Sequence, residues 1–163
     1  MRLFCLACLA LLVAACGGEP AAKLNLGDPA PAFQTKRLDG SALEFPAAAA
    51  GKPLVIRFWA DWCRYCEGEM KAIEAVYQRH KGKGLEVFAV NAGQDRAAVE
   101  AFIRKIGVTY PALLDEQSAI ARRYGVVGLP TTYFVDAKGI VRGKVIGEAD
   151  EAVFERHALE LLK

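Results

Sequence analysis

The sequence predicts an α/β protein in which a mixed central β-sheet carries helices on both faces. A mostly apolar run at 54–59 has the composition of a central strand, because such strands are covered on both sides. Directly after it, Cys66, Met70 and Ile73 have the spacing of one helix face. Further along, the elements run βαβ and then ββα, an order that closes a mixed sheet within one domain.

The other elements follow from short periodic patterns and from the turn residues between them. Asp39-Gly40 separates two candidate strands, about 33–38 and 42–45, which predict an N-terminal β-hairpin extension. Four helices are expected at about 63–80, 95–106, 116–124 and 150–162, with further strands at 85–91, 131–135 and 140–146 and a turn at 136–139.

The first sixteen residues have the pattern of a secretory signal. Residues 3–15 form an unbroken apolar run of thirteen. At about 1.5 Å per residue the run reaches roughly 20 Å, which is too short for a bilayer core of about 30 Å but suits a signal peptide. Residues 13–16, Val-Ala-Ala-Cys, resemble the lipobox of bacterial lipoproteins, in which the cysteine is lipidated. The alternative is a plain signal peptide in which Cys16 is incidental.

Three parts are therefore expected along the chain. Residues 1–15 would be a signal peptide, residues 16–25 the lipidated Cys16 with a flexible tether, and residues 26–163 the folded domain. Several acyl chains on one cysteine would anchor the mature protein stably to a membrane. We expect the domain to work outside the cytoplasm, on the periplasmic side.

Composition and cysteine count narrow the function further. The chain of 163 residues has a formal net charge of only +2, and no Lys/Arg block is long enough to predict a nucleic-acid partner. Of its five cysteines, the expected folded part holds two, both in Cys63-Arg64-Tyr65-Cys66. A disulfide between cysteines this close in sequence would stabilise the fold only weakly, so the pair indicates redox chemistry.

A CxxC pair between an apolar strand and an amphipathic helix has a specific chemical meaning. Cys63 is expected at the helix N-terminus, where unpaired N–H groups and the helix dipole favour a thiolate. One turn brings Cys66 close enough to form a disulfide. Cys63 is the candidate nucleophile and Cys66 the resolving thiol. Arg64 should favour the thiolate, and Tyr65 could pack over the pair or face a partner protein.

Metal binding is the main alternative for a CxxC. A structural zinc needs four ligands, and the two histidines, His80 and His157, lie on helices far along the chain. Cu(I) suits soft thiolates, but His and Met ligands are missing from the motif. We therefore expect neither a metal nor a cofactor.

Three motifs carry a resemblance to a known family. Residues 58–66, Phe-Trp-Ala-Asp-Trp-Cys-Arg-Tyr-Cys, resemble the active-site strand and turn of thioredoxins. Residues 125–136, Gly-Val-Val-Gly-Leu-Pro-Thr-Thr-Tyr-Phe-Val-Asp, resemble the family's cis-proline segment. Residues 27–33, Gly-Asp-Pro-Ala-Pro-Ala-Phe, resemble the entry of its extracytoplasmic TlpA/ResA-like branch. The resemblance covers about 26–163 and implies a thioredoxin fold.

The resemblance also assigns roles to single residues. Pro130 matches the proline that is cis in the family and lies beside the cysteines, so the preceding Leu129 would offer backbone groups to an extended substrate. Trp62, next to the nucleophile, would form substrate-binding surface together with Arg64 and Tyr65.

Glu86 is the candidate proton carrier. Its segment, 84–91, is similar to the ResA-like segment that carries a glutamate near the active site. If Glu86 is buried near Cys66, it could shuttle the proton during exchange; the alternative is a strand-edge glutamate facing solvent. Arg57 occupies the position of the buried Asp of thioredoxins, and pairing of Arg57 with Glu86 would weaken the shuttle hypothesis.

The leading functional hypothesis is a disulfide reductase that exchanges disulfides with extracytoplasmic proteins and is kept reduced by a membrane thiol donor of DsbD/CcdA type. The branch implies two roles, reduction of apocytochrome c during cytochrome c maturation or general thiol protection. A disulfide oxidase is the alternative in the opposite direction. A peroxiredoxin-like thiol peroxidase is another, since residues 28–33 also resemble that group, although Ala60 stands where its motif has Thr.

Overall fold

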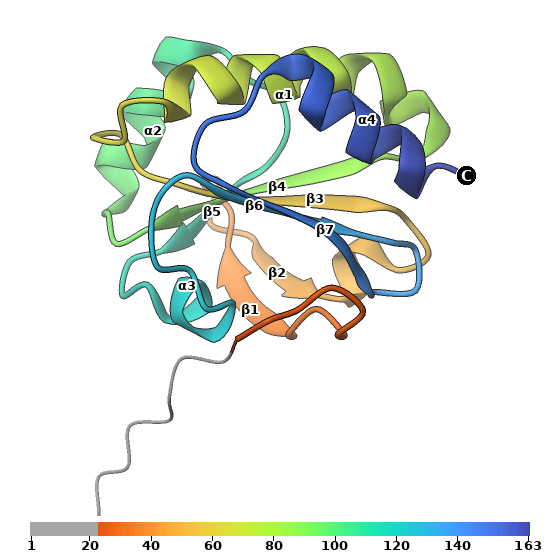
Figure 1. Cartoon of the computed structure of the whole chain (residues 1–163). Coiled ribbons are helices and arrows are strands. Elements are labelled where there is room, and N and C mark those ends of the chain that lie inside the picture. Colours follow the sequence, from red (N-terminus) through yellow and green to blue (C-terminus); the bar gives the residue numbers. More distant parts are fainter. Residues whose placement is uncertain (1–22) are drawn as a thin grey trace, which may run out of the picture.

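The computed structural model of the chain describes residues 23–163 and contains a five-stranded mixed sheet (Figure 1). At its centre, β3 (Leu54–Trp59) pairs in parallel with β4 (Glu86–Ala92), which pairs in parallel with β5 (Ala112–Asp115). On the other side β3 pairs antiparallel with β6 (Thr131–Val135), which pairs antiparallel with β7 (Val141–Ile146). The predicted fold class is confirmed.

Helices lie on both faces of this sheet. One face is covered by α1 (Cys66–His80), α2 (Arg96–Ile106) and α4 (Glu151–Leu161) (Figure 1). The opposite face is covered by α3 (Ala119–Arg123) and by a two-stranded hairpin of β1 (Phe33–Lys36) and β2 (Ala42–Phe45). Single 3-10 turns, Ala47–Ala49 and Lys81–Lys83, precede β3 and follow α1. The predicted N-terminal hairpin is thus confirmed.

Local signals set the helix ends. The Asp95 carboxylate accepts a hydrogen bond from the Ala98 N–H at 2.9 Å and begins α2, and Gly107, in the left-handed region at φ 72°, ends it. Asp150 caps α4 in the same way through the Val153 N–H at 2.9 Å. Both helices therefore lie where the sequence predicts them.

The central strand β3 supplies both hydrophobic cores, because all six of its side chains are buried and alternate between the faces. Val55 and Trp59 enter the core under α1, α2 and α4, together with both cysteines of the CxxC. Ile56 and Phe58 enter the core under the hairpin and α3.

The structure differs from the prediction in two elements. The strand β5 was not predicted, because its four residues are too few to show a period. The first helix begins at Cys66 rather than near residue 63. Leu24 is buried in the hairpin-side core. The predicted signal peptide and Cys16 lie outside the described residues, and within 23–163 no helix is long and apolar enough to cross a membrane.

Candidate active site

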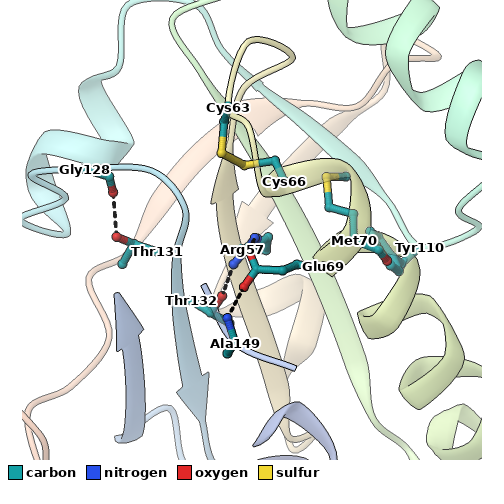
Figure 2. Close-up of polar contacts among 10 residues, drawn as sticks. All are labelled: Arg57, Cys63, Cys66, Glu69, Met70, Tyr110, Gly128, Thr131, Thr132 and Ala149. Carbon is teal, nitrogen blue, oxygen red and sulfur yellow. Dashed lines mark hydrogen bonds and ion pairs between the residues drawn. A yellow bond between two sulfur atoms is a disulfide. The ribbon is translucent and has the colours of Figure 1, made fainter. Parts of the chain in front are cut away.

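The two cysteines of the CxxC form a disulfide at the C-terminal end of β3. Cys63 lies in a turn after the strand and Cys66 is the first residue of α1, with 5.4 Å between their Cα atoms (Figure 2). The Cys66 N–H donates to the Cys63 carbonyl at 3.1 Å, which closes the turn. Cys63 is 7% exposed and Cys66 is fully buried. An incoming thiolate can therefore reach Cys63 only.

Pro130 lies at the same end of the sheet. The Leu129–Pro130 peptide bond is cis, as predicted, and β6 begins at the next residue, whose Cα is the partner of Phe58 in β3. The loop that contains Gly128 passes beside the disulfide on the Cys63 side (Figure 2). Leu129 packs against the core cluster that includes both cysteines.

Exposed aromatic side chains lie next to Cys63 in the chain. Trp62 is 70% exposed and Tyr65 is 42% exposed, and the Arg64 guanidinium lies 5.6 Å from the centre of the Tyr65 ring. Two further exposed apolar residues, not predicted from the sequence, lie on the segments that flank Pro130. Val127 is 86% exposed in the loop before Pro130, and the exposed Ile146 pairs with Thr131. Val127 lies within the cis-proline motif at 125–136, whereas Ile146 has no signal of its own in the sequence.

Glu86 is not part of this site, and the predicted position beside Cys66 is wrong. In the parallel register of β3 and β4, Glu86 pairs with Leu54, at the end of the sheet opposite the cysteines. Its carboxylate accepts a hydrogen bond from Lys52 at 2.7 Å and is partly exposed. The physical reason is the direction of parallel strands: the start of β4 lies beside the start of β3, whereas the CxxC follows the end of β3.

A different glutamate, Glu69, lies on the helix that carries Cys66. It is buried one turn after Cys66, and its Oε2 accepts a hydrogen bond from Arg57 (Figure 2). Its Oε1 accepts the Ala149 N–H at 2.5 Å. The predicted alternative, a pair between Arg57 and Glu86, is therefore also wrong. The spacing Cys66-x-x-Glu69 was the signal that could have found this residue, because residues three apart share a helix face.

Arg57 is fully buried under the disulfide and joins three elements. Besides its bond to Glu69 in α1, its Nη1 donates to the Thr132 hydroxyl of β6 at 2.8 Å. Burial lowers the pKa of Arg57 and the neighbouring Glu69 opposes that effect. The two terminal nitrogens of the buried guanidinium thus have hydrogen-bonding partners within the core, whereas its Nε has none among the described residues.

A second polar group supports the turn before Cys63. The Gln94 Oε1 accepts the Asp61 N–H at 2.8 Å and the Asn91 Nδ2 at 2.9 Å, and the Gln94 Nε2 donates to the Asp61 carboxylate at 2.6 Å. This side chain ties the loop after β4 to the loop that carries Cys63. Within the described part of the chain, no group of three or more His, Cys, Asp or Glu side chains could hold a metal ion.

A CxxC disulfide with one reachable sulfur, beside a cis-proline loop on this fold, defines a thiol–disulfide oxidoreductase of the thioredoxin class. Comparison with known proteins agrees. The family model described as "AhpC/TSA family" matches residues 26–144, so the chain belongs to that family.

The chain also belongs with the ResA thiol–disulfide oxidoreductases. It is 35% identical over 138 residues to "Thiol-disulfide oxidoreductase ResA" of Geobacillus kaustophilus, covering 85% of this chain and 78% of that one. It is 31% identical over 140 residues to ResA of Bacillus subtilis, covering 86% and 77%. Among solved structures, a candidate thiol:disulfide interchange protein DsbE from Chlorobium tepidum matches with a TM-score of 0.81 and 26% identity, covering 86% of this chain and all of that one.

Proposed function

We propose that this oxidoreductase works as a reductase of disulfides in extracytoplasmic proteins. The observation that carries the proposal is the unequal exposure of the two cysteines, since Cys63 is 7% exposed and Cys66 is fully buried. This arrangement suits a nucleophile that meets a large substrate and a resolving thiol that does not. The resemblance to the ResA branch favours the reducing direction.

The reaction conserves two electrons and proceeds in two exchanges. In the reduced protein, the Cys63 thiolate attacks one sulfur of a substrate disulfide, forms a mixed disulfide and releases the first substrate thiolate, which takes up a proton. The Cys66 thiol then loses its proton and attacks the Cys63 sulfur. The second substrate thiol leaves, and the Cys63–Cys66 disulfide seen here remains. A thiol donor must reduce that disulfide before the next cycle.

The substrate would lie on the apolar surface around Cys63. Trp62, Arg64 and Tyr65 border it on one side, and the Leu129–Pro130 loop borders it on the other. An extended segment placed between them would bring its disulfide to Cys63, and the backbone of Leu129 would be available to hydrogen-bond with it. Pro130 would shape this loop next to the reacting sulfurs.

The place of action and the partners come from the N-terminal pattern and the branch resemblance. Residues 1–15 would be removed as a signal peptide, and a lipid on Cys16 would hold the domain at the periplasmic side of a membrane. A membrane protein of DsbD/CcdA type would supply the thiols that reduce Cys63–Cys66. Apocytochrome c, whose cysteines must be reduced before haem attachment, is the specific substrate we propose.

Trapping of the mixed disulfide tests the proposal. In Cys66→Ser the resolving thiol is absent, so Cys63 should retain its substrate as a covalent complex that survives denaturation and disappears on reduction. Cys63→Ser is the matched control, because it has one cysteine of the pair but lacks the reachable one. Complexes with extracytoplasmic cysteine proteins in Cys66→Ser alone are expected. Equal trapping by the two variants would contradict the proposed roles.

A peroxide assay tests the alternative that the protein is a thiol peroxidase. Turnover of hydrogen peroxide by the reduced wild-type protein should be absent or far slower than disulfide exchange, because Ala60 stands where peroxiredoxins have Thr. Peroxide turnover faster than disulfide exchange would favour the peroxidase.

A further inference from the structure

The side chain of Gln94 reaches from the loop after β4 to the loop that carries Cys63. Trp59, the last residue of β3, is the Cα partner of Asn91 near the end of β4, so the loops after these two parallel strands leave the sheet side by side. Gln94 therefore lies close to Asp61, which precedes Cys63 by two residues. The two exchange steps at the cysteines give this contact no role.

The amide of Gln94 uses both its acceptor and its donor in this contact. Its Oε1 accepts the Asp61 N–H at 2.8 Å and the Nδ2 of the buried Asn91 at 2.9 Å, and its Nε2 donates to the Asp61 carboxylate at 2.6 Å. Because a backbone N–H can only donate, the amide oxygen must face the Asp61 N–H and the amide nitrogen must face the carboxylate. A glutamate would supply the acceptors but no donor, and it would place a second negative charge against Asp61.

The backbone on both sides of Gln94 is held in place. Directly before it, the Gly93 N–H donates to the carbonyl of Asp115, the last residue of β5, at 3.0 Å. Directly after it, Asp95 caps α2 by accepting the Ala98 N–H at 2.9 Å. Gln94 therefore contacts the cysteine loop from a fixed support.

The turn that Gln94 contacts gains little support from the core. The Cys63 N–H donates to the Ala60 carbonyl at 3.2 Å, which closes the turn. Its two middle residues, Asp61 and Trp62, are exposed. Since neither side chain is buried in the core, the hydrogen bonds from Gln94 fix the position of this turn relative to β4.

We propose that Gln94 is a positioning residue for disulfide exchange. Through Asp61 it fixes the turn that presents the Cys63 sulfur to the partner sulfur. Placement matters for the rate, because a shift of a reacting group by about 1 Å can cost about 100-fold. The inference rests on exchange at Cys63 but not on its direction, so an oxidising midpoint potential would overturn the reductase proposal and leave this one standing.

The test compares the rates at which the reduced proteins react with 2-hydroxyethyl disulfide, a small neutral disulfide whose approach does not depend on an added charge. Gln94→Glu keeps the size of the side chain but replaces the donor to Asp61 with a carboxylate, so we expect the rate to fall about tenfold. The double variant Asp61→Asn, Gln94→Glu again places an amide opposite a carboxylate, with the roles exchanged. Its rate should return to within about threefold of wild type. A single variant at the wild-type rate, or a double variant as slow as the single one, would overturn the proposal.

Gln78→Glu is the matched control, because it makes the same change far from the cysteines. The Gln78 Nε2 donates to the Glu74 carboxylate at 2.6 Å, the distance also found between Gln94 and Asp61. Gln78 lies about three turns along α1 from Cys66, so its variant should react within about twofold of the wild-type rate. A loss equal to that of Gln94→Glu would contradict the positioning role, since an added charge anywhere would then have the same effect.

Hydrogen exchange at the Asp61 amide of the wild-type protein tests the contact without any substitution. Because this amide donates to Gln94, it should exchange at least about tenfold more slowly than in an unfolded chain, although Asp61 is exposed. Exchange at the rate of an unfolded chain would overturn the proposal, whether or not the variants fold. Urea unfolding of each variant establishes that the compared rates belong to folded proteins.

Discussion

The two faces of the central sheet differ in chemistry although one strand supplies both. Arg57 and Phe58 are neighbours in β3, yet Arg57 enters the core with the disulfide and an ion pair, whereas Phe58 enters a cluster of aromatic rings. The Phe58 ring lies 5.3 Å from Tyr124 and 6.2 Å from Tyr133 between centroids. The comparison teaches that one strand can pack an aromatic core on one face of the sheet and hold the disulfide with a buried ion pair on the other.

Truncation of Phe58 should separate these two roles most clearly. Phe58→Ala removes a fully buried ring, and we expect the free energy of unfolding to fall by about 3–5 kcal/mol. The midpoint potential of Cys63–Cys66 should stay at the wild-type value, because the ring lies on the other side of the sheet. Denaturant unfolding and a redox titration measure the two quantities. Phe58→Leu, as the control, should lose less stability. A midpoint potential of Phe58→Ala that differs clearly from the wild-type value would contradict the separation of the faces.

His157 offers a second test of the difference between the two faces. It lies on the helix face of the sheet, away from the cysteines. Its ring stacks on Phe134 at 4.4 Å, and burial lowers the pKa of His157, with Glu160 opposing this and Arg156 adding to it. The unfolded chain therefore takes up the proton first as pH falls below about 6.5, so the stability contributed by neutral His157 is lost as pH falls through that value.

His157→Gln should remove this acid sensitivity. Between about pH 7 and pH 5, we expect wild type to lose less than about 1 kcal/mol of stability relative to the variant. Urea unfolding at several pH values measures it. Parallel stability curves for the two proteins would show that His157 titrates alike in the folded and unfolded chains.

The smallest effect is expected at Glu86. Glu86→Gln breaks only a partly exposed pair with Lys52, so stability should change by less than about 0.5 kcal/mol and exchange should proceed at the wild-type rate. Lys52→Gln, which removes the other partner, is the matched control. An exchange rate that is reduced in Glu86→Gln but not in Lys52→Gln would show that Glu86 takes part in the reaction.

Much of the fold could be predicted because its signals are local. The run at 54–59, the cap residue Asp95 and the glycine at 107 each determine one element through their own chemistry. The strand β5 could not be predicted in the same way, because four residues are defined by their pairing with β4 rather than by a pattern of their own. The sequence alone predicted Cys63 and Cys66 from their spacing and Pro130 from its motif.

The supporting residues of the site could not be predicted so directly, because they depend on register. Glu86 and Glu69 are both glutamates near apolar residues in the sequence. Only the parallel register of β4 with β3 places the first at the far end, and only the packing of α1 on the sheet brings the second onto Arg57. Ile146 likewise lies beside Pro130 only because β7 pairs with β6, and the Gly147 N–H donates to the Pro130 carbonyl at 2.9 Å.

The midpoint potential of the Cys63–Cys66 couple tests the central claim most directly. It is measured by equilibrating the wild-type domain with thiol–disulfide buffers and quantifying free thiols. A reductase should have a potential well below about −200 mV, and we predict that value here. A potential near −120 mV, the range of a strong oxidant, would contradict the account.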